Sequence, residues 1–242
     1  MYKGIDKNMK KINLLGYNLL DLILLGLGIM TISVVSIIFK SPWYILISTL
    51  LGVMCVFTQA KGQIITQFIG AIYFCFYIFI SYTQKLYGEA ILYLIIMLPL
   101  YIYGIIHWLK NSDKKDNVVI VRSNLPKKEW MFISIAFVFL SFGVYFLLKL
   151  LNTAQLIIST LSFLSMLPAV YLLSRRCKWN QVAFLINDFI VPILWLAMIM
   201  SGEFILIPLC IYHIFQITYD IYGLINWTKL EKKQKQEQIN KL

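Results

Sequence analysis

The sequence has few of the side chains from which metal and catalytic sites are usually built. Two histidines and four cysteines occur among its 242 residues, and the cysteines have neither the paired spacing nor the neighbouring histidines of a metal site. The motifs H-E-x-x-H, G-x-S-x-G and G-x-x-x-x-G-K-[ST] are also missing from the sequence. We therefore expect no metal, no cofactor and no enzymatic activity, and we interpret the cysteines as small apolar fillers.

Charged residues are scarce as well. They make up 14% of the chain, whereas hydrophobic residues make up 60%, which is well above the share in soluble domains. A helix needs about 20 residues to cross a bilayer. Apolar runs of suitable length lie near 19–38, 43–58, 63–82, 89–109, 130–150, 154–173, 181–200 and 203–227. The composition therefore predicts an all-α polytopic membrane protein with eight transmembrane helices in a lipid bilayer.

The first apolar run is expected to persist as a helix. Asp21 stands at its start, the run is nearly a full span, and no small-residue cleavage site follows it, so it lacks the form of a secretory signal. The second run, 43–58, is short. We expect it either to take residues from the 58–63 turn or to cross with little tilt.

Basic residues are distributed unevenly between the two sides of the expected helices. The net charge is +11, with 22 Lys and Arg, and all but three of these fall in alternate loops and in the termini. Those segments are 3–11, 61, 110–128, 175–178 and 228–242, and the exceptions are Lys40, Lys85 and Lys149. By the positive-inside rule, both termini and the basic loops are cytoplasmic in a plasma membrane. Orientation therefore explains the charge without a nucleic-acid partner.

Two pairs of stretches suggest an internal repeat. "YGIIHWLK" (103–110) and "YGLINWTK" (222–229) share Tyr-Gly, a Trp five positions after the Tyr, and a final Lys. Upstream, "YGEAIL" (87–92) and "SGEFIL" (201–206) both place Gly-Glu at the start of the same two helices. A three-helix unit thus occurs twice. Because one linker helix separates the copies, they run in the same direction, as in transporters whose substrate binds near the midplane between parallel halves.

The repeat sets the expected organisation of the chain. The units are 1–40 (N-terminus and extra helix), 41–110 (first repeat), 111–151 (loop and linker helix), 152–228 (second repeat) and 229–242 (charged tail). We pair Gln67 with Asn187 as matching positions on the third and seventh helices. Tyr103, Trp108, Tyr222 and Trp227 are expected to anchor or close the inner face.

The stretches "GVMCVFTQAKGQIITQFIGAIYF" (52–74), "KLYGEAILYLIIMLP" (85–99) and "YIYGIIHW" (101–108) resemble the PnuC-type vitamin transporters. The resemblance covers nearly everything after the first helix, which matches an extra N-terminal helix in some members. It implies a 3+1+3 fold related to the SWEET sugar transporters and a homo-oligomer, for example a trimer. It also implies facilitated diffusion of a vitamin, usually nicotinamide riboside, that is retained by cytoplasmic phosphorylation.

The family's nicotinamide riboside signature, Trp-x-x-x-Asn, is altered in this sequence. It falls on Phe184 and Asp188, with Asn187 one residue earlier. The changed amide leaves thiamine, deoxynucleosides and riboflavin open as alternative substrates. Phe184 and Asp188 share one helix face, which Trp195 continues, and this face could stack a ring and fix its polar edge.

Asp188 lies inside a span, where an unpaired charge costs at least about 2.5 kcal/mol. Three interpretations stay open: the carboxylate bonds ribose hydroxyls, it faces a cationic ring, or it is a structural acid paired inside the bundle. The span itself contains no basic residue, which argues against the third.

Other polar and aromatic residues are candidates for the opposite wall of the site: Gln67, Tyr73, Tyr77, Tyr212 and Gln216. A simple interhelical hydrogen bond is an equal alternative for Gln67. We interpret His213 as a packed, hydrogen-bonded residue and Asp220 as a surface contact to the 174–180 loop. Glu89 and Glu203 are expected to be structural acids at helix N-termini. A non-transporting membrane scaffold is the alternative class, but it would have no need of an inward polar face.

Overall fold

The computed structural model describes residues 17–113 and 117–240. Its elements are α1 (Leu19–Ile38), α2 (Trp43–Ala60), α3 (Ile65–Thr83), α4 (Tyr87–Leu92), the π-helical turn η1 (Tyr93–Met97), α5 (Leu98–Lys110), β1 (Ser112–Asp113), β2 (Val118–Val119), α6 (Lys127–Leu150), α7 (Leu156–Ser174), α8 (Asn180–Met200), the 3₁₀ turn η2 (Phe204–Leu206) and α9 (Ile207–Ile239). Within the described ranges, eight helical segments are long and apolar enough to cross a membrane. This confirms the predicted fold class. The expected cytoplasmic residues 1–16, and residues 114–116 and 241–242, lie outside the described part of the chain.

Local sequence accounts for several helix boundaries. At the start of α1, the Asn18 side chain accepts from the Asp21 amide while the Asp21 carboxylate accepts from the Asn18 amide, which satisfies two free N–H groups. Pro42 and Pro126 immediately precede α2 and α6, where a missing N–H costs nothing. Helix α2 continues to Ala60. It therefore takes residues from the 58–63 turn, which is the first of the two expectations for this short run.

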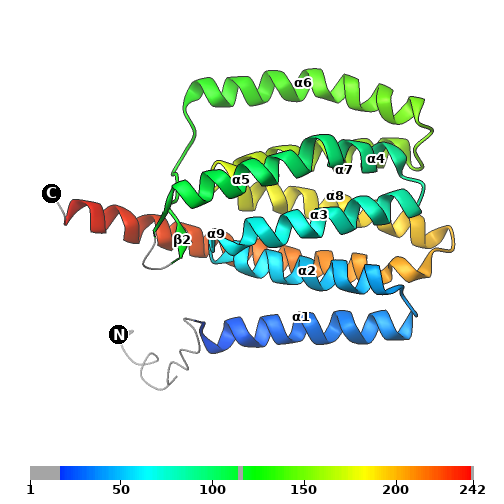
Figure 1. Ribbon diagram of the computed structural model, residues 1–242, viewed down its shortest axis with the longest axis horizontal. Coiled ribbons are helices and arrows are strands. Elements are labelled where there is room, and N and C mark those ends of the chain that lie inside the picture. Colours follow the sequence, from blue (N-terminus) through cyan, green and yellow to red (C-terminus); the bar gives the residue numbers. More distant parts are fainter. Residues whose placement is uncertain (1–16, 114–116, 241–242) are drawn as a thin grey trace, which may run out of the picture.

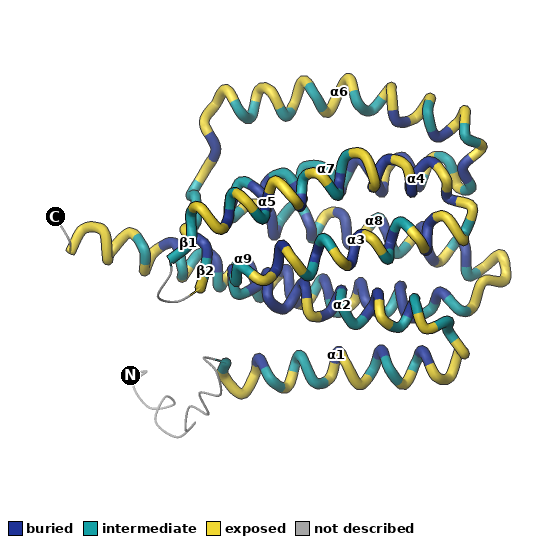
Figure 2. The backbone as a smooth tube through the Cα atoms, viewed as in Figure 1, coloured by how far each residue is buried: buried dark blue, intermediate teal, exposed yellow. Residues whose placement is uncertain are grey.

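The spans form two three-helix units with one further helix on each flank (Figure 1). The first unit contains α2, α3 and the continuous span α4–η1–α5, and the second contains α7, α8 and the span η2–α9. The units meet along two seams, α2 against α9 and α5 against α7. Outside them, α1 packs on α2 and α9, and α6 packs mainly on α7. Figure 2 shows burial concentrated inside the two units, while α1 and α6 are largely exposed.

The turn that leads into the second helix has the same form in both units. Gly62 and Arg176 occupy it with φ of 67° and 62°. The next residues, Gln63 and Cys177, each form a bridge to the connecting segment 117–122. The two units therefore repeat in backbone geometry as well as in sequence.

This turn corrects the pairing of Gln67 with Asn187. Counted from the equivalent turns, Gln67 corresponds to Gln181. Each glutamine also lies against a glycine of the third helix of its unit: a Cβ on Gly104 would lie 2.4 Å from the Gln67 amide oxygen, and one on Gly223 would lie 2.8 Å from the Gln181 amide. Both helices begin after a basic turn, but sequence similarity alone did not fix their register.

One end of the bundle, here called the basic end, gathers the two equivalent turns, the connecting segment and the tail of α9 (Figure 1). The Val119 amide donates to the Gly62 carbonyl at 2.9 Å. Arg176 donates to the Ile120 carbonyl at 2.9 Å. Burial, followed by the neighbouring charges Arg122 and Arg175, lowers the pKa of Arg176 to about 10, so this guanidinium stays charged at neutral pH. Lys40, Lys85 and Lys149 lie in or beside the turns at the opposite end.

Candidate functional site

A group of polar side chains is buried between α8 and α9. Asp188 and His213 are 0% and 3% exposed, and the Asp188 Oδ1 atom lies 3.2 Å from His213 Nδ1. The Asp220 carboxyl lies beside that of Asp188, and Gln181 completes the group. We call these four residues the central polar cluster. The span of Asp188 contains no basic residue, but the structure supplies a partner from the next helix.

The position of Asp220 differs from the prediction. Asp220 is 2% exposed and is not a surface contact to the 174–180 loop. With its amide oriented to suit both neighbours, Gln181 donates to Asp220 Oδ1 at 3.1 Å, and its oxygen lies 3.2 Å from Trp227 Nε1, whose single N–H it shares with the Gln59 carbonyl. The absence of a side chain at Gly223 lets Gln181 approach α9 this closely. The sequence repeat does not indicate Gln181, because pairing Gln67 with Asn187 places the second unit in the wrong register.

The predicted stripe on α8 faces the protein interior. Phe184, Asp188, Val191 and Trp195 are all buried. Asp188 Oδ2 has no hydrogen-bond partner among the described residues. One carboxylate oxygen of Asp188 thus pairs with His213, and the neighbouring Asp220 carboxyl is the other polar group beside it.

Asn187 points toward α7 instead. Its amide nitrogen donates to the Ser162 carbonyl at 3.1 Å and to Ser165 Oγ at 2.8 Å. These bonds join two helices of the same unit. Both amide N–H groups of Asn187 are therefore used within the second unit, whereas its Oδ1 atom has no hydrogen-bond partner among the described residues.

Aromatic side chains from the other unit complete the surroundings. Tyr73 of α3 lies 5.9 Å, centroid to centroid, from Tyr212 of α9, and 6.1 Å from Tyr77. Tyr77 meets Trp195 edge-on at 5.8 Å. These predicted residues therefore come together as an aromatic wall across the interface between the two units.

The two predicted amides Gln67 and Gln216 are buried, at 1% and 3% exposure. Neither Gln67 Nε2 nor Gln216 Oε1 has a hydrogen-bond partner in the described part of the chain. Gln67 packs against Gly104 close to the basic end, so it lies apart from the predicted stripe. Gln216 stands between His213 and Asp220 on α9.

The two repeat tryptophans form reciprocal contacts between the units. Trp108 of α5 donates to the Leu173 carbonyl at the end of α7 (2.9 Å), and Trp227 of α9 donates to the Gln59 carbonyl at the end of α2 (2.7 Å). Their ring centroids are 5.9 Å apart, and both side chains are 0% exposed. They therefore close the space between the units at the basic end.

The two repeat tyrosines, Tyr103 and Tyr222, have different hydrogen-bond partners. Tyr103 is 40% exposed and accepts a hydrogen bond from Arg175 at 2.9 Å. The Tyr222 hydroxyl donates to Asp21 of α1 and accepts from Lys61 at 3.0 Å. Tyr222 thus fastens the extra helix α1 to the second unit, a role that the repeat does not predict.

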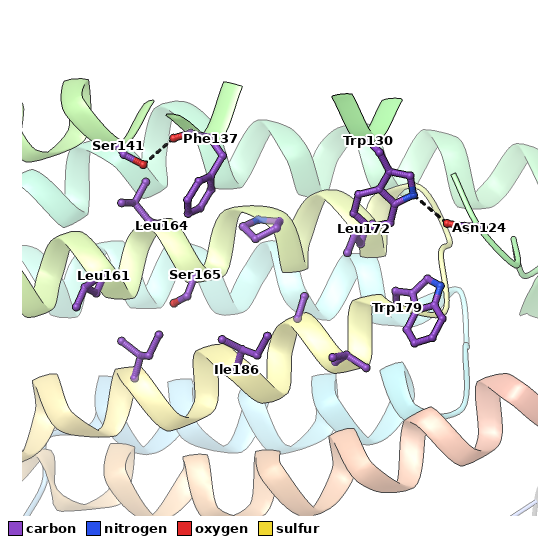
Figure 3. A pocket seen from close by; sticks show the side chains of 14 residues that line it. Asn124, Trp130, Phe137, Ser141, Leu161, Leu164, Ser165, Leu172, Trp179 and Ile186 are labelled. Carbon is purple, nitrogen blue, oxygen red and sulfur yellow. Dashed lines mark hydrogen bonds between the residues drawn. The ribbon is translucent and has the colours of Figure 1, made fainter. Parts of the chain in front are cut away.

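A groove of about 910 Å³ lies elsewhere, between α6 and the α7–α8 pair (Figure 3). None of the predicted site residues lines it. Its polar groups are already bonded: Asn124 accepts from Trp130, Ser141 donates to the Phe137 carbonyl and Ser165 accepts from Asn187. The groove therefore offers a ligand mainly apolar surface, of the kind that acyl chains cover in a bilayer.

The two Gly-Glu pairs end in different environments. Glu203 is exposed just before η2. Glu89 lies in the first turn of α4, as predicted, but it is 0% exposed. Among the described residues, no group of three His, Cys, Asp or Glu side chains is arranged to hold a metal ion.

These features define a class. Two parallel helical units enclosing a buried polar and aromatic site, closed at one end by tryptophans, have the architecture of a multi-pass membrane transporter. The chain belongs to the nicotinamide mononucleotide transporter family, because the model of that family matches residues 42–231. That match begins after α1, in agreement with an extra N-terminal helix.

Two similar proteins extend this comparison. The nicotinamide riboside transporter PnuC of Neisseria mucosa is 27% identical over 216 residues, which are 87% of this chain and 81% of that protein. A crystal structure of the vitamin B3 transporter PnuC shares the fold with a TM-score of 0.78 at 23% identity, covering 90% of this chain and 94% of that one.

Proposed function

We propose that the protein mediates facilitated uptake of nicotinamide riboside. The observation that carries the proposal is the buried α8 stripe. Phe184 and Asp188 stand where the family signature falls, and they face the interior of the bundle. The name of the Neisseria relative supports the same substrate. Asp188 in place of the signature amide favours a second candidate, a facilitator of thiamine, a deoxynucleoside or riboflavin.

The proposed transport cycle uses the two units as halves that part and close. We propose residues 41–110 and 152–228 as these halves, with substrate held between the aromatic wall and the α8 stripe. Opening toward the basic end requires Trp108 and Trp227 to separate from the ends of α7 and α2. With no ion coupling in this scheme, retention depends on a cytoplasmic enzyme that phosphorylates the vitamin. We also propose a homo-oligomer, since only 11% of the most apolar stretch of α6 is buried within one chain.

Binding tests the substrate directly. Purified protein is expected to unfold at a higher temperature with nicotinamide riboside, because a ligand at 100 times its dissociation constant adds about 2.7 kcal/mol of stability. Thiamine, a deoxynucleoside and riboflavin are measured in parallel, followed by uptake into proteoliposomes. A shift with one of these alone would reassign the substrate, and a shift with none would contradict the transport proposal.

Topology can be tested independently of substrate. We propose that the basic end is cytoplasmic and that both termini lie on that side of the plasma membrane. A reporter active only in the cytoplasm, inserted after Asn117, is expected to be active, and the same reporter inserted after Asn152 is expected to be silent. The reverse pattern would overturn the charge argument.

A further inference from the structure

A second group of polar side chains is buried toward the end of the bundle opposite the basic end. It consists of Glu89 (α4), Tyr77 (α3), Tyr93 (η1), Ser162 (α7) and Trp195 (α8), here called the outer cage. Each side chain is at most 3% exposed. Both Glu89 oxygens, the three hydroxyls and the Trp195 N–H have no hydrogen-bond partner among the described residues. Buried polar groups normally have hydrogen-bond partners. Six unpartnered polar atoms in one cluster therefore require an explanation.

The members of the outer cage are neighbours. The Ser162 and Tyr77 hydroxyls lie beside the Glu89 carboxylate, without forming a hydrogen bond of ordinary geometry. The Tyr77 and Tyr93 ring centroids are 4.7 Å apart, and Trp195 meets Tyr77 edge-on at 5.8 Å. The cage is thus one carboxylate among three aromatic rings, built from both units.

Packing against the linker helix turns Glu89 inward. The Gly88 amide donates to Thr153 Oγ1 at 3.1 Å, and a Cβ on Gly88 would lie 2.1 Å from Leu148 Cδ2 of α6. In the other repeat, a Cβ on Gly202 would meet nothing within 4 Å, and Glu203 remains in solvent. The same Gly-Glu pair therefore yields a buried acid only where α6 covers it.

The chemistry of the cage identifies a suitable ligand group. A carboxylate removed from water without a partner is costly, and a cation offsets that cost. Aromatic faces also attract cations, most strongly when the cation is desolvated. The rings pack against one another here, so a ligand must part them, as the opening of two halves would do. A flat cation would then contact both the carboxylate and the ring faces.

We infer that the outer cage recognises the positive charge of a cationic ring, with Glu89 as the residue that selects for charge. This inference rests on the proposed function, since nicotinamide riboside carries a permanent pyridinium charge. It assigns charge recognition to Glu89 and leaves the polar edge of the ring to Asp188. His213 faces Asp188, whereas no basic side chain among the described residues pairs with Glu89.

The test compares nicotinamide riboside with its dihydro form, which has the same substituents and no charge on the ring. Wild-type protein is expected to bind the cation about tenfold or more tightly, in line with coupling energies of buried charge pairs. Glu89→Gln keeps the size of the side chain and removes its negative charge. We expect this variant to bind nicotinamide riboside more weakly and the dihydro form with unchanged affinity, which abolishes the preference. Glu89→Asp should retain part of it. Glu203→Gln, the repeat-equivalent exposed position, is the matched control and should leave both affinities unchanged.

The outcomes separate the inference from the proposed function. If wild-type protein binds neither compound, the proposed function fails. If wild-type protein binds both equally, or if Glu89→Gln weakens both equally, the charge-recognition role is wrong while transport stands. The wild-type ratio decides the question even if Glu89→Gln does not fold.

Discussion

Replacing Trp108 or Trp227 by alanine is expected to lower the free energy of unfolding by about 3 to 5 kcal/mol in each case. Each indole is fully buried and bonded to a helix-end carbonyl of the other unit, so alanine leaves a cavity at the contact between the units. Trp108→Phe and Trp227→Phe should cost only about 1 kcal/mol. The Leu173 and Gln59 carbonyls keep bonds from the Arg176 and Gly62 amides.

Denaturant unfolding of the detergent-solubilised protein measures these differences. Trp179→Ala is the control, because Trp179 lies at the same end but is 42% exposed. Both buried positions should lose stability, since each indole donates to a helix-end carbonyl of the other unit, and Trp227 also contacts Gln181. A loss at Trp108 or Trp227 no larger than that at Trp179 would contradict their role in closing the units.

Asp188→Ala is expected to weaken binding of nicotinamide riboside by about 100-fold, as loss of a hydrogen bond to a charged group costs up to about 3 kcal/mol. Asp188 Oδ2 has no hydrogen-bond partner among the described residues, and a ligand that separates Asp188 from Asp220 would bond to it. Asp188→Asn restores the signature amide, and we expect it to change the ratio of affinities for nicotinamide riboside and thiamine more than it changes the amount of folded protein.

Isothermal titration calorimetry on the purified variants gives both affinities, and thermal unfolding without ligand reports any damage to the fold. Phe189→Ala is a suitable control because Phe189 is the next residue of α8 and is 62% exposed. Unchanged affinities for every compound in both Asp188 variants would show that Asp188 is only structural, paired with His213.

Much of the fold was predictable from composition. Eight apolar runs and one-sided basic loops specify the helices, because the bilayer requires long apolar helices. The Phe184, Asp188 and Trp195 stripe was also predictable, since helical spacing alone places those residues on one face. The residue-to-residue correspondence between the two units was harder to predict from sequence. Gln67 was paired with Asn187 because a basic turn precedes both helices, whereas the backbone of those turns pairs it with Gln181.

Interhelical partners could not be predicted, since they depend on which surfaces meet. His213 and Asp220 were expected to be a packed histidine and a surface acid. In the structure α9 lies along α8 and brings both beside Asp188. Tyr103 and Tyr222 hold equal places in the repeat, yet only Tyr222 meets the extra helix α1.

The sequence by itself determined the all-helical membrane fold, the repeat and the inward stripe, because these follow from local apolar content and helical periodicity. Tertiary structure alone decided which acids are buried. Glu89 and Glu203 follow the same glycine at the start of corresponding helices, but Gly88 lies inside α4 whereas Gly202 adopts a φ of 109° before η2. The linker helix α6 is present once and covers only the first, because Gly88 allows its close approach. That contact, together with the different backbone at the two glycines, buries one acid of the pair in the interior of the bundle.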